Sequence, residues 1–176
     1  MNRAQLEHII GAAATIAEDD DIVILGSQAI LGQFPDAPAE LLVSVEADVY
    51  PMRHPDRADL VDGSIGEPSP FHETFGYYAQ GVGEETAILP EGWKERLVPV
   101  QSRRTRGATG WCLEVHDLAI AKAFAGREKD QRFIEVLARH GLVEPTILEA
   151  RLAVTTREPE LHEVVRRRLA RWCAAV

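Results

Sequence analysis

A short apolar run that ends in Gly-Ser constrains the fold of this chain more than any other feature. Residues 22–25 (IVIL) are apolar and mostly β-branched, which predicts a buried strand. Gly26 and Ser27 follow directly, and the small and apolar residues 28–32 then predict a helix. A strand that ends in Gly-Ser at a helix start offers backbone N–H groups and a hydroxyl to a phosphate. A serine N-cap on an ordinary helix is the competing interpretation.

A second strand is predicted over residues 41–50 (LLVSVEADVY) because its apolar side chains alternate with polar ones. The apolar face is expected to carry Leu41, Val43, Val45, Ala47 and Val49. Glu46 and Asp48 share the other face, ~6.5 Å apart along the strand. Such a carboxylate pair suits Mg²⁺ or Mn²⁺ shared with substrate phosphates. A solvated strand face is the alternative, although Val45 and Val49 favour a buried strand.

A third candidate feature lies where the pattern becomes helical, from residue 116 onward. Lys122 stands among small and apolar residues, so it either extends to water or supplies a cation to a site. The charged residues that follow are Arg127, Lys129 and Asp130. If the helix continues through Gly126, Lys122 and Lys129 share a face and can neutralise a triphosphate. A solvated charged turn between two helices explains the same residues.

The remaining pattern predicts an α+β fold. An opening helix is expected over residues 6–17, a short helix over 57–61, and strand or loop over 71–82. Further strands are expected at residues 86–89, 96–100 and 109–115. Helices are expected over 116–125 and 128–139, and others begin near Pro145 and Pro159. We therefore expect residues 1–115 to form a mixed α/β core, with a helical part (116–176) packed on it.

Composition narrows the class of protein. The chain has 176 residues, 45% of them hydrophobic, and a net charge of −9, which disfavours a dedicated DNA or RNA binder. No apolar run approaches the ~20 residues that span a bilayer, so no membrane partner is expected. Its two cysteines indicate neither a disulfide framework nor a zinc site, and a cytoplasmic location fits best. Arg103, Arg104 and Arg106 form a local basic cluster that fits either RNA phosphates or a solvated hairpin tip.

Together these motifs resemble the minimal nucleotidyltransferases of the DNA polymerase β superfamily. The chain is most similar to a family of small bacterial proteins of uncharacterised function in that superfamily, near the AbiEii-type nucleotidyltransferase toxins. The blocks that carry this resemblance lie at residues 75–78 (FGYY), 89–100 (LPEGWKERLVPV) and 105–130 (TRGATGWCLEVHDLAIAKAFAGREKD). The similarity extends over about residues 24–142, and it implies a small mixed sheet flanked by helices.

The resemblance also implies roles for particular residues. Gly26 and Ser27 would hold nucleotide phosphates, and Glu46 and Asp48 would bind the metal. Lys122 would contact the triphosphate, and Asp130 would support it or bind the acceptor, with Arg127 and Lys129 beside them. The superfamily prefers Asp at the position of Glu46. Its third carboxylate has no clear match, and Glu114 is the first candidate and Asp117 the second.

The reaction implied is Mg²⁺-dependent transfer of a nucleoside monophosphate from a nucleoside triphosphate (NTP) to a hydroxyl on RNA, a protein or a small molecule. A toxin-like role with an antitoxin-like partner is implied by the resemblance alone. The alternative is a catalytically inactive nucleotide-binding or protein-interaction module on the same fold. A metal-dependent phosphohydrolase is a weaker possibility, because the His-rich ligand sets of that class are absent among the six histidines.

Overall fold

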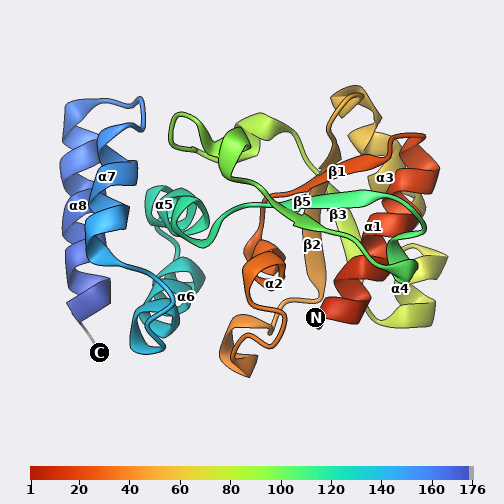
Figure 1. The fold of residues 1–176 in the computed structure, drawn as a ribbon, viewed down its shortest axis with the longest axis horizontal. Coiled ribbons are helices and arrows are strands. Elements are labelled where there is room, and N and C mark those ends of the chain that lie inside the picture. Colours follow the sequence, from red (N-terminus) through yellow and green to blue (C-terminus); the bar gives the residue numbers. More distant parts are fainter. Residues whose placement is uncertain (175–176) are drawn as a thin grey trace. The chain divides into compact units, whose positions relative to one another are not determined.

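The chain folds into two compact units, seen here in a computed structural model that describes residues 1–174 (Figure 1). The first, which we call the sheet unit, contains residues 1–86 and 97–113. The second, the helical unit, contains residues 87–96 and the chain from Glu114 onward. The predicted α+β class is confirmed, since a small mixed sheet flanked by helices is joined in sequence to a helical part.

The sheet unit is built around one mixed sheet. Its strands are β1 (Asp21–Ile24), β2 (Glu46–Pro51), β3 (Tyr78–Gly81), β4 (Val98–Val100) and β5 (Thr109–Cys112). They lie in the order β3-β2-β1-β5-β4. The central strand β1 is antiparallel to β2 and parallel to β5, while β3 runs parallel to β2 and β4 runs antiparallel to β5. The apolar run that precedes Gly26 therefore lies at the centre of the sheet.

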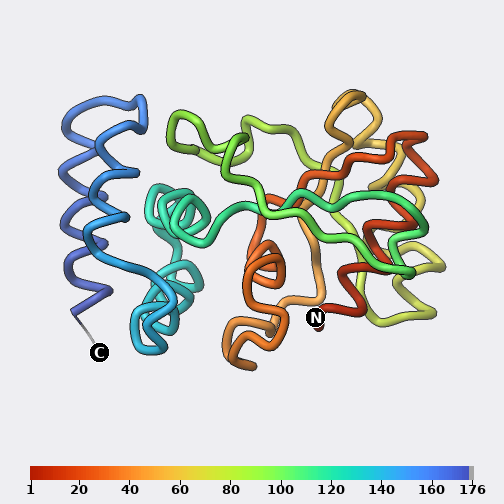
Figure 2. The backbone as a smooth tube through the Cα atoms, in the orientation of Figure 1, coloured from red at the N-terminus to blue at the C-terminus, as the bar shows by residue number. Residues whose placement is uncertain are grey.

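Helices cover this sheet on both sides. They are α1 (Arg3–Ala17), α2 (Ile30–Gln33), α3 (Ala58–Ile65) and α4 (Pro70–Phe75). The apolar stripe of α1 is fully buried, and Asn2 caps the helix through a capping box with Gln5. Figures 1 and 2 show α1 and α3 on one side of β2 and α2 on the other. One side of β2 thus faces the packed core, and the other side carries the acidic residues of this strand.

Two predicted strands differ from the structure. Residues 39–41 form a 3-10 turn and β2 begins only at Glu46, so Val43 and Val45 are 81% and 45% exposed rather than buried. The reason is that β3 pairs with β2 only from Glu46 onward, which leaves the preceding residues without a partner strand. Residues 86–89 form no strand, and residues 87–96 belong to the helical unit. The segment predicted as strand or loop contains α4 as well as β3.

The helical unit contains the predicted helices: α5 (Val115–Ala125), α6 (Glu128–Arg139), α7 (Pro145–Ala153) and α8 (Pro159–Ala174). The helices predicted over residues 116–125 and 128–139 are confirmed as separate helices, so the condition that one helix continues through Gly126 is not met. Gly126 has a φ of +67°, a left-handed conformation that ends a helix and favours glycine. Lys122 and Lys129 therefore lie on different helices. Within residues 1–174, no helix combines the length and apolar character needed to cross a membrane.

Candidate functional site

The carboxylate of Asp48 packs directly against Gly26 in the sheet unit. A Cβ atom placed on Gly26 would lie 1.7 Å from Asp48 Oδ2, closer than any real contact. The backbone N–H of Leu25 donates to the carbonyl of Asp48 at 3.0 Å and fixes the end of β1 beside β2. Glycine is required here by this close approach and not by its conformation, because its φ is −79°. The end of β1 and the acidic strand thus form one tightly packed corner.

The helical turn that follows Gly26 is short. Ser27–Ala29 form a 3-10 turn, and α2 adds only four further residues. A helix this short has a weak dipole, so any phosphate grip here depends on individual N–H groups and on the Ser27 hydroxyl. The buried Gln28 donates from Nε2 to the carbonyl of Ser44 at 3.3 Å. That bond ties the turn to the segment that leads into β2.

Glu46 already has a hydrogen-bond partner. The Tyr78 hydroxyl lies 2.9 Å from Glu46 Oε2 and 3.2 Å from Glu67 Oε2. A phenol has one proton, so it donates to one of these carboxylates at a time. Burial and the two neighbouring carboxylates raise the pKa of Tyr78 above its ordinary value. Tyr78 therefore stays protonated and holds the Glu46 side chain in place.

The donor groups of this corner fit a hard divalent cation. Glu46 and Asp48 alternate with the buried Ala47 and Val49, so both carboxylates lie on the same face of β2. The register of β3 places Gln80 beside Asp48, which adds an amide oxygen to the set. Oxygen donors of this kind are what Mg²⁺ takes, with waters and substrate phosphates completing its shell. Glu46 and Asp48 are the residues that would hold the ion.

Lys122 forms a buried ion pair within the helical unit. Its side chain is 8% exposed, and Nζ lies 3.3 Å from Asp130 Oδ1 and 4.5 Å from the ring centre of Phe133. Burial alone would raise the pKa of Asp130, but hydrogen bonds from Arg127 and the charge of Lys122 hold it below its ordinary value. This pair joins α5 to α6. The role of Lys122 at a triphosphate stays a prediction.

The neighbouring charged residues differ in how they are held. Arg127 donates from Nε to Asp130 Oδ2 at 2.7 Å, and its backbone N–H is bonded to the same oxygen at 3.2 Å. Arg127 therefore caps α6, although most of its side chain is exposed. Lys129 is exposed on the first turn of α6. The structure brings Lys122, Arg127 and Asp130 together, and Lys129 lies beside them in sequence only.

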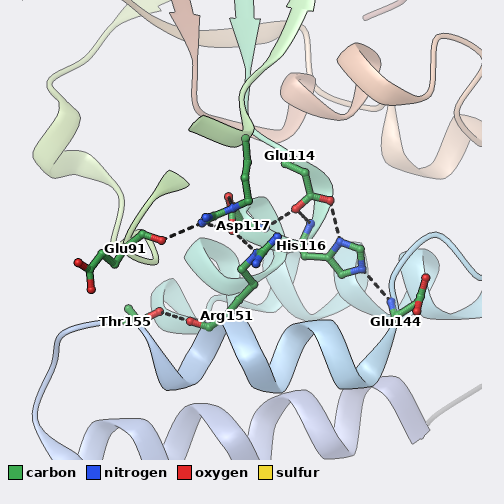
Figure 3. Close-up of polar contacts among 8 residues, drawn as sticks. Glu91, Glu114, His116, Asp117, Glu144, Arg151 and Thr155 are labelled. Carbon is green, nitrogen blue, oxygen red and sulfur yellow. Dashed lines mark hydrogen bonds and ion pairs between the residues drawn. The ribbon is translucent and has the colours of Figure 1, made fainter. Parts of the chain in front are cut away.

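Glu114, the first candidate for a third carboxylate, is the N-cap of α5 (Figure 3). Its Oε2 accepts the N–H of His116 at 3.0 Å, and its Oε1 lies 2.7 Å from His116 Nδ1. His116 Nε2 accepts the N–H of Glu144, so Nδ1 carries the proton that is donated to Glu114. Burial would raise the pKa of Glu114, but these hydrogen bonds lower it. Both of its carboxylate oxygens are thus engaged within the helical unit.

Asp117, the second candidate, is the centre of a buried ionic cluster that sequence reasoning missed (Figure 3). Its fully buried carboxylate receives a fork from Arg96, with Nε at 2.8 Å and NH2 at 3.1 Å. Arg151 Nε lies 3.1 Å away on the other side. Arg96 also donates to the carbonyl of Glu91, which anchors residues 87–96 in this unit. The block around residues 89–100 thus contributes a structural arginine.

An α+β unit whose central strand ends in Gly-Ser beside a strand with two carboxylates is the arrangement expected of a nucleotidyltransferase-like protein. The chain belongs to a family described as nucleotidyltransferases of unknown function (DUF6036), which matches residues 4–172. The resemblance inferred from the sequence is confirmed at this level, and the closer similarity to AbiEii-type toxins stays a prediction. No curated protein and no solved structure matches the chain significantly.

Proposed function

We propose that the protein transfers a nucleoside monophosphate from an NTP to a hydroxyl group of an acceptor, which is RNA, a protein or a small molecule. One observation carries this proposal: the Asp48 carboxylate lies against the Gly26 backbone, with Glu46 on the same face of β2. Phosphate-binding backbone and metal-binding carboxylates then meet at one point of the sheet. Membership of a nucleotidyltransferase family supports the same class of reaction.

Each residue of this corner has a defined task in the proposal. The Gly26 backbone and the Ser27 hydroxyl bind phosphate oxygens of the NTP, and the absence of a side chain at Gly26 leaves room for the Asp48 carboxylate beside them. Glu46 and Asp48 hold Mg²⁺, which when bound neutralises charge on the phosphates and on the leaving pyrophosphate. Tyr78 keeps Glu46 oriented through its 2.9 Å hydrogen bond. Catalysis then consists of positioning and charge neutralisation.

The transfer itself balances without a covalent enzyme intermediate. The acceptor oxygen forms a bond to the α-phosphorus while the bond from that phosphorus to the bridging oxygen breaks, which releases pyrophosphate. The proton of the acceptor hydroxyl passes to water. No other reactant is needed.

The test is a calorimetric titration of ATP, CTP, GTP and UTP with and without Mg²⁺. Wild type is compared with Asp48→Asn and with Asp59→Asn, a matched control on the exposed surface of α3. We expect NTP binding that requires Mg²⁺, is lost in Asp48→Asn and is retained in Asp59→Asn. Pyrophosphate release with candidate acceptors then identifies the second substrate. An absence of binding of any NTP by wild type would refute the proposal.

An inactive nucleotide-binding or interaction module is the second candidate function. Two observations favour it: Glu46 is hydrogen-bonded to Tyr78, and Gln80 occupies the position in register with Asp48. NTP binding that is indifferent to both Mg²⁺ and Asp48→Asn would support this module. The same titration therefore separates the two functions.

A further inference from the structure

A hollow of about 390 Å³ lies on the sheet unit, away from the acidic corner. It is bordered by the first two turns of α1, by Tyr77 just before β3, and by the loop between β4 and β5. Arg103, Arg104 and Arg106 of that loop all line it, together with His8 and Tyr77. In a chain with a net charge of −9, three arginines on one hollow form a local positive site.

The loop that carries these arginines is fixed to α1. The Ser102 hydroxyl donates to Glu7 Oε2 at 2.9 Å, and Ser102 also caps the 3-10 turn Arg103–Thr105. Thr105 is 1% exposed. The carbonyl of Arg104 approaches Gly11 so closely that a Cβ there would lie 2.8 Å from it. The arginines therefore project from an anchored turn, which argues against a merely solvated hairpin tip.

The arginine charges are largely uncompensated. Within residues 1–174, the acid nearest to Arg104 is Glu7, at 4.0 Å, and neither Arg103 nor Arg106 has an ion pair. Arg106 also has a φ of +55°, a left-handed conformation that costs energy for any residue with a side chain. Strained residues of this kind concentrate at functional sites. A planar guanidinium matches the oxygens of a phosphate in two parallel hydrogen bonds.

The opposite wall of the hollow is aromatic and polar. His8 Nδ1 lies 2.8 Å from the Tyr77 hydroxyl, and the His8 ring packs on Phe75 with ring centres 4.7 Å apart. Burial and the charge of Arg106 lower the pKa of His8, so its ring is neutral near pH 7. An anion beside the arginines would favour its protonated form. This wall offers hydrogen bonds and ring surface next to the cationic loop.

We propose that this hollow binds the phosphomonoester of a nucleotide, as a second phosphate site separate from Gly26 and Asp48. Three guanidinium groups supply the charge, and His8 and Tyr77 supply a polar aromatic wall. Its volume suits a single nucleotide, whether free or at the 5′ end of an RNA strand. Tyr77 contacts His8 in the hollow, and its neighbour Tyr78 contacts Glu46 in the acidic corner. The two proposed sites therefore contact consecutive residues at the start of β3.

The experiment is a binding titration in EDTA at low ionic strength, where a metal-dependent site is silent. The probes are AMP, adenosine, inorganic phosphate, and one RNA trinucleotide with and without a 5′-phosphate. We expect wild type to bind AMP and the phosphorylated RNA but not adenosine. Arg103→Ala and Arg106→Asn should each weaken AMP binding about tenfold, as expected for loss of a charged hydrogen bond. Asparagine is chosen at 106 because it tolerates the left-handed conformation.

Two control variants complete the design. Arg132→Ala removes an exposed arginine on α6, which is paired with Glu128, and should leave AMP binding unchanged. Asp48→Asn should also leave it unchanged, because the acidic corner is a different site. Tighter binding of the phosphorylated RNA than of AMP would assign the site to an RNA end, and equal binding would assign it to a mononucleotide.

Three results from wild type and the loop variants would overturn the proposal. They are failure of every phosphate probe to bind wild type, equal binding of AMP and adenosine, and AMP binding that survives both loop substitutions. Loss of AMP binding in Asp48→Asn would place the phosphate at the Gly26 corner instead. That result would remove this inference and leave the proposed transferase intact.

Discussion

Replacement of Lys122 by methionine should destabilise the helical unit. The Lys122 ammonium is buried against Asp130 and Phe133, so the substitution leaves the Asp130 carboxylate without one of its two cations. Removing one partner of a buried ion pair costs about 3–5 kcal/mol. Asp130 keeps Arg127 at 2.7 Å, so we expect a loss near the lower limit, about 3 kcal/mol.

The measurement is urea unfolding followed by circular dichroism at 222 nm, a wavelength that reports helix. Lys129→Met removes an exposed lysine from the same region and should change the free energy of unfolding by no more than ~0.5 kcal/mol. A double-mutant cycle with Asp130→Asn isolates the interaction between the two side chains. Its coupling free energy should be about 1–3 kcal/mol, as for residues in direct contact.

One result would refute this reasoning. If Lys122→Met unfolds at the same urea concentration as wild type but no longer binds an NTP, the lysine does not stabilise the join between α5 and α6. Its ammonium would then serve the triphosphate, as the sequence resemblance implies. Loss of stability with unchanged NTP binding would assign Lys122 to structure alone.

Other perturbations test the remaining parts of the two units. Gly26→Ala should displace the Asp48 carboxylate, because the new Cβ would lie 1.7 Å from Oδ2. Calorimetry should then show Mg²⁺-dependent NTP binding at least tenfold weaker than that of wild type. Unchanged binding would contradict the close contact between Gly26 and Asp48. Asp117→Ala should lower the free energy of unfolding by about 3 kcal/mol, the lower limit for a broken buried pair, because Arg96 and Arg151 lose their shared carboxylate but are themselves 22% and 25% exposed. A loss below ~1 kcal/mol in urea unfolding would contradict this. Burial would raise the pKa of Asp19, but hydrogen bonds from three backbone N–H groups lower it below its ordinary value. The ionised Asp19 therefore stabilises the fold above about pH 4, and this stabilisation is lost as the pH falls through the lowered pKa. The stability difference between wild type and Asp19→Asn should therefore shrink in acid, and a constant difference from pH 7 to pH 2 would contradict this.

Sequence patterns predicted the elements whose burial follows a simple period. The strand at residues 22–25 is a continuous apolar run, whereas the opening helix, α6 and α8 carry apolar stripes at helical spacing, and the structure has all four elements. The extent of β2 was not predictable in this way. Residues 41–45 alternate as a strand does, but β3 begins opposite Glu46 and leaves them unpaired. Strand length depends on the partner strand, which a local pattern does not contain.

The candidate site shows the same division between local and non-local information. The placement of Glu46 and Asp48 on one face follows from a period of two and was predictable. The contact between Gly26 and Asp48 joins residues from two strands, and nothing local to either indicates it. The sequence singles out the isolated Lys122 on α5 but not its partner, because the resemblance implies that Lys122 contacts the triphosphate and that Asp130 supports it or binds the acceptor. The turn at Gly126 brings Asp130 back to Lys122 instead, and that return depends on one left-handed residue.

The search for a third carboxylate illustrates why strand register matters more than sequence proximity. Glu114 follows β5 in the sequence and was the first candidate, but it caps a helix in the other unit. The side chain beside Asp48 belongs to β3, where parallel register places Gln80. An amide there can donate an oxygen to a cation but adds no negative charge. Glu46 and Asp48 therefore supply two formal negative charges on one face of β2, which balance the charge of one divalent ion, and Glu67 reaches the same corner through the Tyr78 hydroxyl. We expect such a site to bind Mg²⁺ more strongly together with a nucleotide, whose phosphate oxygens would complete the coordination shell, so the proposed titration varies both together.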